Sequence, residues 1–162
     1  MLAMILTGIG FDIHQFARKR RLVLGGVEIP HSVGLLGHSD ADVLCHAVAD
    51  ALLGAVADGD IGKHFPNTDP RWKDADSLDL LAAVAKRVKF RGGRVINVDS
   101  TVMAQQPKIA PHVEAMRRHL AKAIGIPVAR VSVKATTMEG LGAIGRGEGI
   151  AAMAVATVTR NG

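Results

Sequence analysis

The sequence predicts a single α+β domain over residues 1–162, in which a mixed β-sheet carries its helices on one face. Three observations support this fold class. The chain has 162 residues, a length typical of one domain. Apolar residues repeat with the period of a strand in some segments and of a helix in others, in the order strand, helices, strand, helix, strand, strand. No repeat, linker or low-complexity segment interrupts that order.

The N-terminal third is predicted to form one long strand and one helix. The strand covers residues 4–14, and a short apolar piece at 22–29, interrupted by two glycines, precedes a loop at 30–39. A helix over 41–56 follows, because the pair Ser39-Asp40 can cap it. One face of this helix repeats at helical spacing through Val43, Ala47, Asp50, Ala51 and Gly54.

The rest of the chain alternates helices and strands. Residues 58–70 contain too much Gly, Pro and Asp for regular structure, and a helix is predicted over 75–90. A strand over 94–104 precedes a helix over 111–124, which ends at Gly125. The remaining segments are predicted as a strand over 131–135, a glycine-rich loop over 136–149 and a strand over 150–158.

The last predicted strand is apolar on both of its faces. One face carries Ile150, Ala152, Ala154 and Val158, and the other carries Ala151, Met153 and Val155. A strand of this kind is buried on both sides. Three helices are too few to cover both faces of the sheet, so we expect a second subunit to cover one of them and the chain to form a homo-oligomer.

Composition excludes several classes of protein. The net charge is +5, but the chain lacks tyrosine and a basic helix, so we expect no nucleic-acid partner, and the basic balance fits a small anionic substrate. The apolar runs are too short to span a membrane, and no leader segment is recognised, so no membrane partner is expected. Cys45 is the only cysteine, which indicates a reducing, cytoplasmic location.

Asp12, His14 and His46 form the most informative set of side chains. Asp12 and His14 alternate in the first strand and therefore point to the same side, and His46 in the following helix can complete the set. One oxygen and two nitrogens are typical of a catalytic zinc with an open fourth position. A structural role for either histidine stays open at this point, and Asp42, one helical turn before His46, could orient its ring.

Two loops could hold a phosphorylated substrate. The segments Asp58–Gly62 and Phe65–Asp69 bring three carboxylates together, either as acceptors for substrate hydroxyls or as ordinary polar loop residues. Residues 134–149 combine glycines with Lys134, Thr136, Thr137 and Arg146, and Glu139 among these donors suits a second, magnesium-like cation. The sequence contains no recognisable protein nucleophile, which favours a reaction whose substrate supplies its own.

Five segments identify a family resemblance: Gly8–His14, Leu24–Pro30, Gly37–His46, Asp58–Pro66 and Gly145–Ala151. They resemble the 2-C-methyl-D-erythritol 2,4-cyclodiphosphate synthase family of the non-mevalonate isoprenoid pathway, in family order and nearly end to end. The resemblance implies a metal-dependent phosphorus-oxygen lyase that releases CMP from 4-diphosphocytidyl-2-C-methyl-D-erythritol 2-phosphate. It also implies a homotrimer with active sites between subunits, a zinc ion and a magnesium or manganese ion.

The resemblance assigns roles by position. Zinc would be held by Asp12, His14 and His46, and magnesium by Glu139, while His38 and Thr137 would stabilise the transition state. Asp12, His14, His38 and Ser39 would also contact the substrate. The methylerythritol part would lie on Asp60, Ile61, Gly62, Phe65, Asn67, Thr68 and Asp69. The cytidine diphosphate part would lie on Ala104, Pro107, Lys108, Ile109, Ala110, Thr136, Thr137, Met138, Glu139 and Arg146.

Two departures concern the nucleotide end. Met138 stands where the family usually has a third threonine, and Ala143 stands where a phenylalanine is common. Two rival functions are a metal-dependent phosphohydrolase, which would incorporate water oxygen into a linear product, and a non-enzymatic trimeric binding protein with a structural metal. A structural zinc normally has four protein ligands, so a fourth close side chain would favour the binding protein.

Overall fold

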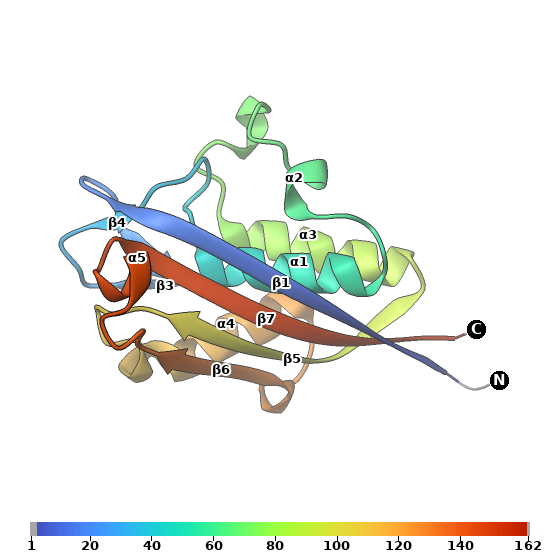
Figure 1. Ribbon diagram of the computed structural model, residues 1–162. Helices are drawn as coiled ribbons and strands as arrows, with labels where there is room; N and C mark the ends of the chain where they lie inside the picture. Colours follow the sequence, from blue (N-terminus) through green and yellow to red (C-terminus); the bar gives the residue numbers. More distant parts are fainter. Residues whose placement is uncertain (1–2, 162) are drawn as a thin grey trace.

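The computed structural model describes residues 3–161, so residues 1, 2 and 162 of the predicted 1–162 domain lie outside its described part. Seven strands and five α-helices follow one another along the described chain, joined in places by single 3-10 turns (Figure 1). The strands are β1 (Met4–Ala17), β2 (Leu22–Leu24), β3 (Val27–Ile29), β4 (Gly34–Leu35), β5 (Gly93–Met103), β6 (Val131–Thr136) and β7 (Gly149–Arg160). The helices are α1 (Val43–Ala55), α2 (Ile61–His64), α3 (Ser77–Phe90), α4 (Val113–Ile124) and α5 (Gly142–Gly145).

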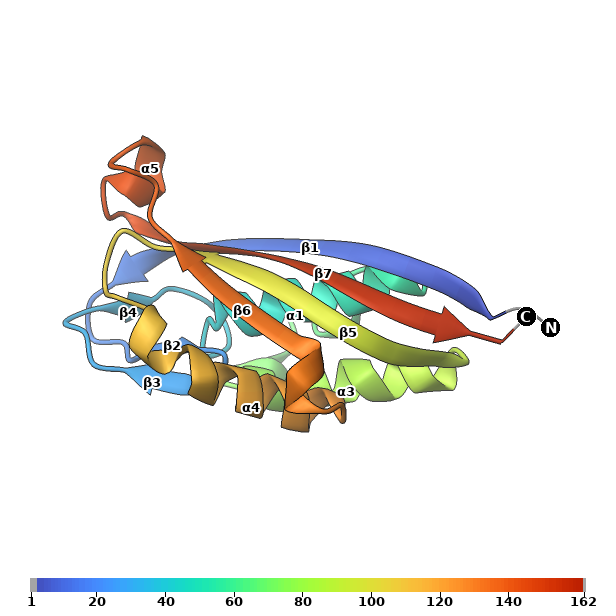
Figure 2. The ribbon, with the colours of Figure 1, turned by 90° about the horizontal axis from the view of Figure 1, so that it is seen from below.

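The main sheet is mixed, as predicted. Its strand order is β4-β1-β7-β5-β6, with β5 and β6 parallel and the other neighbours antiparallel, while β2 and β3 form a separate hairpin. The helices α1, α3 and α4 lie together on one face of this sheet, and the short α5 projects from the other side at one end (Figure 2). The predicted α+β class with helices on one face is therefore confirmed.

The apolar core lies between the sheet and α1, α3 and α4. Every second residue of β7 from Ile150 to Val158 points into it and is buried, together with the apolar side of α1. Helix α3 begins at the N-cap Asp76, whose side chain accepts a hydrogen bond from Leu78. Helix α4 ends at Gly125, whose left-handed backbone at φ 81° allows the chain to turn, as predicted.

Several predicted boundaries were wrong. The first strand continues to Ala17, because it pairs with β7 as far as Gln15 and with β4 beyond that point. The N-cap of α1 is Asp42, whose carboxylate accepts from Cys45, and not Ser39 or Asp40. The segments predicted as irregular contain short ordered elements: β4 in 30–39, α2 and a 3-10 turn at Pro70–Trp72 in 58–70, and α5 in 136–149.

The second face of the sheet is open in the single chain. Met153 and Val155 of β7 are about two-fifths exposed, so the prediction of burial on both sides does not hold within one subunit. Neighbouring β1 exposes Ile5, Ile9, Phe11 and Ile13 on the same side. A contiguous apolar surface of this kind marks an interaction site. We call these six residues the open face.

None of the helices in residues 3–161 has the length and apolar composition needed to cross a bilayer. The single cysteine, Cys45, is buried in α1 and packs as a core residue, as its position in the sequence predicts.

Candidate metal centre and substrate cavities

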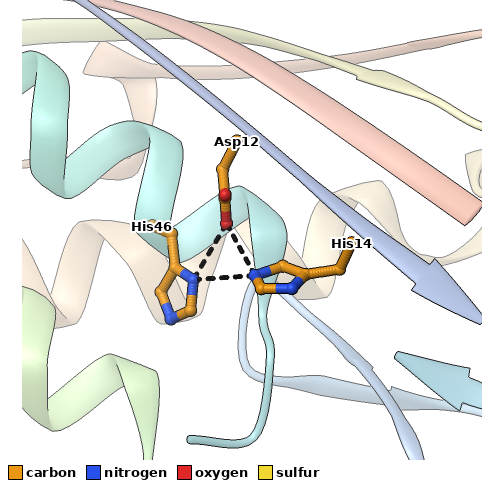
Figure 3. A group of neighbouring side chains, drawn as sticks. All are labelled: Asp12, His14 and His46. Atoms are coloured by element: carbon orange, nitrogen blue, oxygen red, sulfur yellow. Dashed lines mark hydrogen bonds and ion pairs between the residues drawn. The ribbon is translucent and has the colours of Figure 1, made fainter. Parts of the chain in front are cut away.

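Asp12, His14 and His46 converge at one point between β1 and α1 (Figure 3). Asp12 and His14 occupy alternate positions of β1, on the side of the strand that faces α1. Their side chains point toward His46, which lies in the first turn of α1. The predicted clustering of these three residues is therefore confirmed.

Two glycines of β1 bring the helix close enough to complete the cluster. A Cβ atom at Gly8 or Gly10 would overlap the backbone oxygen of Ala51 or Ala47, respectively, in α1. The backbone of α1 therefore packs directly against β1, and the contact of Gly10 with Ala47 lies one residue beyond His46. The glycines at these positions serve close approach, because neither has a positive φ.

The donor atoms fit a tetrahedral metal ion. The Oδ2 atom of Asp12 lies 2.9 Å from both His14 Nε2 and His46 Nδ1, and the two nitrogens are 3.4 Å apart. Two ligand atoms that are each about 2.0–2.1 Å from a tetrahedral zinc lie about 3.3 Å from one another. The three distances between the donor atoms here are close to that value. Within residues 3–161, the group contains three metal-binding side chains and no fourth His, Cys, Asp or Glu, the number typical of a catalytic site.

The cluster shifts the acid–base properties of its members. Burial favours the neutral form of Asp12, but hydrogen bonds and charge from His14 and His46 outweigh it and lower the pKa of Asp12 from 3.8 to about 2. Burial alone would lower the pKa of His14, yet the hydrogen bond and charge of Asp12 raise the pKa above 6.5. Asp12 is thus a carboxylate at neutral pH, as metal binding requires.

The second nitrogen of His46 contacts residues that the sequence did not indicate. His46 Nε2 lies 2.9 Å from Ser77 Oγ and 3.2 Å from Ser39 Oγ. The suggestion that Asp42 orients His46 was wrong. The Asp42 carboxylate instead accepts from the backbone N–H groups of Cys45, Gly25 and Gly26, and so joins α1 to the β2–β3 turn.

A cavity of about 210 Å³ opens beside the cluster. Phe65 and Trp72 meet edge to face at 5.0 Å in its apolar wall, and Trp72 was not predicted. The Nε1–H of Trp72 is a buried donor without a partner in the described structure. The predicted residues that line this cavity are Asp12, His14, His38, Ser39, His46, Ile61, Gly62, Phe65 and Asn67.

The carboxylates of the neighbouring loop have structural partners. Asp60 caps α2 by accepting from Lys63, and Asp69 pairs with Arg71 at 2.6 Å. Asp58 is buried and pairs with Arg87 of α3 at 2.7 Å. Asp60, Thr68 and Asp69 are not among the residues that line the cavity. The loop is held in place by these contacts, and its backbone reaches the cavity at Ile61 and Gly62.

A second cavity, of about 160 Å³, collects most of the residues predicted for the nucleotide. Gln105 connects its two loops, because its Oε1 accepts from the backbone of Met138 and Gly140 at 3.4 Å. Among the remaining predicted residues, Glu139 accepts from the Thr137 hydroxyl at 3.2 Å, and Arg146 pairs with Glu148. The predicted residues in the lining are Ala104, Pro107, Lys108, Ile109, Ala110, Thr136 and Thr137.

The two cavities flank opposite edges of the sheet. The pairing register places Ile13, Ala151, Met103 and Thr136 in one row across β1, β7, β5 and β6. Three strand spacings of about 4.8 Å separate the ends of this row by about 14 Å. Asp12 and His14 face the helices, whereas the loop containing α5 rises on the other side (Figure 2). The two cavities of one chain are therefore separate.

Comparison with known proteins identifies close relatives of this chain. Residues 5–159 match the YgbB family. The protein named 2-C-methyl-D-erythritol 2,4-cyclodiphosphate synthase from Halalkalibacterium halodurans is 59% identical over 152 residues, which cover 94% of this chain and 97% of the relative.

Solved structures show the same fold. The bifunctional IspDF of Campylobacter jejuni superposes with a TM-score of 0.95 at 43% identity, covering 99% of this chain and 43% of that longer protein. The IspF of Plasmodium falciparum, solved as a CDP complex, gives a TM-score of 0.85 at 31% identity and full coverage of both chains. Both structures share the fold of this chain over nearly its whole length.

Proposed function

The chain belongs to the YgbB family, and on this premise we propose that it is a 2-C-methyl-D-erythritol 2,4-cyclodiphosphate synthase of non-mevalonate isoprenoid precursor biosynthesis. The reaction converts 4-diphosphocytidyl-2-C-methyl-D-erythritol 2-phosphate to the cyclic diphosphate and releases CMP, as a phosphorus-oxygen lyase does. The observation that carries the proposal is the open three-donor cluster on the wall of a cavity of about 210 Å³. It occurs in a chain that aligns with 97% of a named synthase.

The nucleophile is the 2-phosphate of the substrate. Cys45 is unsuited to attack, because burial raises the pKa of its thiol and keeps it protonated. A phosphate monoester has a second pKa near 6 and is charged at neutral pH, so it needs no strong base. The work of the protein is then to fold the substrate for in-line attack on the β-phosphorus and to balance the charge that develops.

Asp12, His14 and His46 are proposed to hold zinc, since their donor types and separations fit it. Bound there, the ion supplies Lewis-acid polarisation of the β-phosphate. Ser39 and His38 lie on the loop that borders the same cavity, where His38 can donate to a phosphate oxygen. Its Nε2 is 3.3 Å from the backbone oxygen of Asp69, which connects this loop to the neighbouring one.

The two cavities are proposed to divide the substrate. The cavity beside the cluster takes the methylerythritol part, and the two loops reach its lining at Ile61, Gly62, Phe65 and Asn67. The second cavity takes the cytidine diphosphate part, on segments 104–110 and 136–139, with Arg146 near the phosphates. Thr137 lines this cavity and would stabilise charge, and its hydroxyl donates to the Glu139 carboxylate, which would hold magnesium or manganese.

A homotrimer with active sites between subunits completes this arrangement. The half-sites of one chain lie at opposite edges of its sheet, so one small substrate needs half-sites from two subunits. Association through the open face would bring them together and bury Ile9, Phe11 and their neighbours. Burial of that surface stabilises an assembly by about 25 cal/mol per Å² of apolar area.

The test combines purified protein, the cytidyl substrate, zinc and magnesium, with the products followed by phosphorus NMR. We expect the cyclic diphosphate and CMP in equal amounts. The variant His46→Ala is expected to lose both zinc and CMP release, because one of three ligands is removed. Full turnover by the metal-free protein would contradict the zinc assignment.

A further inference from the structure

Ser77 connects His46 of the metal cluster to the carboxylate of Asp40. Ser77 is the first residue of α3 and is 1% exposed, and Asp40 lies in the loop before α1. We propose that Ser77 and Asp40 are positioning residues, which hold the His46 proton on Nε2 and leave Nδ1 free to bind the metal. The inference deepens the proposed function, because it rests on the zinc site described above.

The Ser77 hydroxyl has a single proton to donate. Ser77 Oγ is hydrogen-bonded to Asp40 Oδ1, and a carboxylate can only accept. Ser77 therefore donates to Asp40 and can only accept from its other neighbour, His46 Nε2, at 2.9 Å. The Nε2 atom of His46 must then carry a hydrogen. In a neutral imidazole this leaves Nδ1 without one, facing Asp12 and His14.

Asp40 is fixed as an acceptor by the groups around it. Its carboxylate also accepts from the backbone N–H groups of Ser77, at 3.0 Å, and Asp42, at 3.1 Å. Lys19, Arg20 and Arg21 line a pocket together with Asp40. Three donors therefore hold the Asp40 carboxylate in place, so it remains the acceptor of the Ser77 hydroxyl proton.

Ser39 is the weaker partner of His46. Its Oγ lies 3.2 Å from Nε2 and also accepts from the backbone N–H of Ala41 at 3.3 Å. Nothing in these contacts dictates where its own proton points, so Ser39 alone cannot select the tautomer. Without Ser77, His46 could carry its proton on Nδ1 and donate it to Asp12, 2.9 Å away. The proton would then block the nitrogen that binds the metal.

The test uses the metal-free protein and its zinc complex. Nitrogen NMR of the metal-free wild type should show His46 protonated on Nε2. Ser77→Ala should populate the other tautomer and weaken zinc binding about 10- to 100-fold in competition with a chelator. Ser77→Thr keeps the hydroxyl and should restore affinity. Ser100→Ala is the matched control, because it removes a buried serine that donates to the Ser132 backbone at 2.9 Å, away from the cluster.

Two results would overturn the inference: a wild-type His46 that carries its proton on Nδ1, or a Ser77→Ala variant that binds zinc as tightly as wild type. The first is measured on the wild type alone and so remains decisive if a variant fails to fold. Failure of the zinc assignment has a different signature. A wild type that carries the Nε2 proton and does not bind zinc would contradict the proposed metal and support only the assignment of the proton to Nε2.

Discussion

Replacing Gly10 by alanine should separate α1 from β1 and dismantle the metal cluster. The new Cβ would overlap the Ala47 carbonyl oxygen and lie 2.8 Å from the Ala47 carbonyl carbon, against an ordinary contact of 3.4 Å or more. The second distance alone requires a shift of at least about 0.6 Å, and zinc–ligand distances tolerate only about 0.2 Å. His46 adjoins Ala47, so this shift moves the histidine away from Asp12 and His14.

The expected cost is about 1–3 kcal/mol of folding free energy, typical of overpacking. For a domain of this size, each kcal/mol lowers the melting temperature by about 2–4 °C. Zinc affinity, measured by chelator competition, should fall with it. Gly54→Ala is the matched control, because a Cβ there has its nearest neighbour at 3.8 Å and should add about 0.5–1 kcal/mol of helix stability. A Gly10→Ala variant with the melting temperature and zinc affinity of wild type would show that close approach at Gly10 does not hold the cluster together.

Three further predictions concern the ion pair, the open face and the nucleotide cavity. The hydrogen bond from Arg87 lowers the pKa of Asp58 in the folded protein. The ion pair therefore stabilises the folded state above about pH 4, and this stabilisation is lost as the pH falls through the folded-state pKa of Asp58. Denaturant titrations should therefore show Asp58→Asn less stable than wild type at pH 7, with a difference that shrinks in acid. Ile9→Asp should dissociate the proposed trimer in native mass spectrometry, whereas Phe90→Asp, at a more exposed apolar residue on α3, should not. A trimeric Ile9→Asp would contradict the proposed interface. Thr137→Ala should reduce kcat about 100-fold and leave zinc affinity unchanged, and an unaltered kcat would remove Thr137 from the mechanism.

The sequence was sufficient for the parts of the site that depend on local periodicity. Asp12 and His14 share a face because strand residues alternate, and this holds in any fold that contains the strand. The structure brings His46 to the cavity that Asp12 and His14 line, and part of each predicted substrate loop lines one of the two cavities; the roles of these residues stay predictions. The cytoplasmic location and the identities of the metals stay predictions.

The remaining parts depend on contacts between segments far apart in the chain. Ser77 lies 31 residues from His46, and no pattern of spacing relates them. Asp42 was misassigned because helical spacing places it near His46, while its carboxylate is taken by the β2–β3 turn. The short helices at 61–64 and 142–145 escaped prediction because single helical turns have no apolar period to detect. Tertiary structure decides each of these features.

In the proposed reaction the substrate attacks itself, so no water enters the product. Turnover in isotopically labelled water, followed by mass spectrometry of both products, tests this most directly. We expect the cyclic diphosphate and CMP, each free of oxygen from the solvent. Solvent oxygen in CMP, or in a linear methylerythritol phosphate product, would show hydrolysis and rule out attack by the substrate's own phosphate.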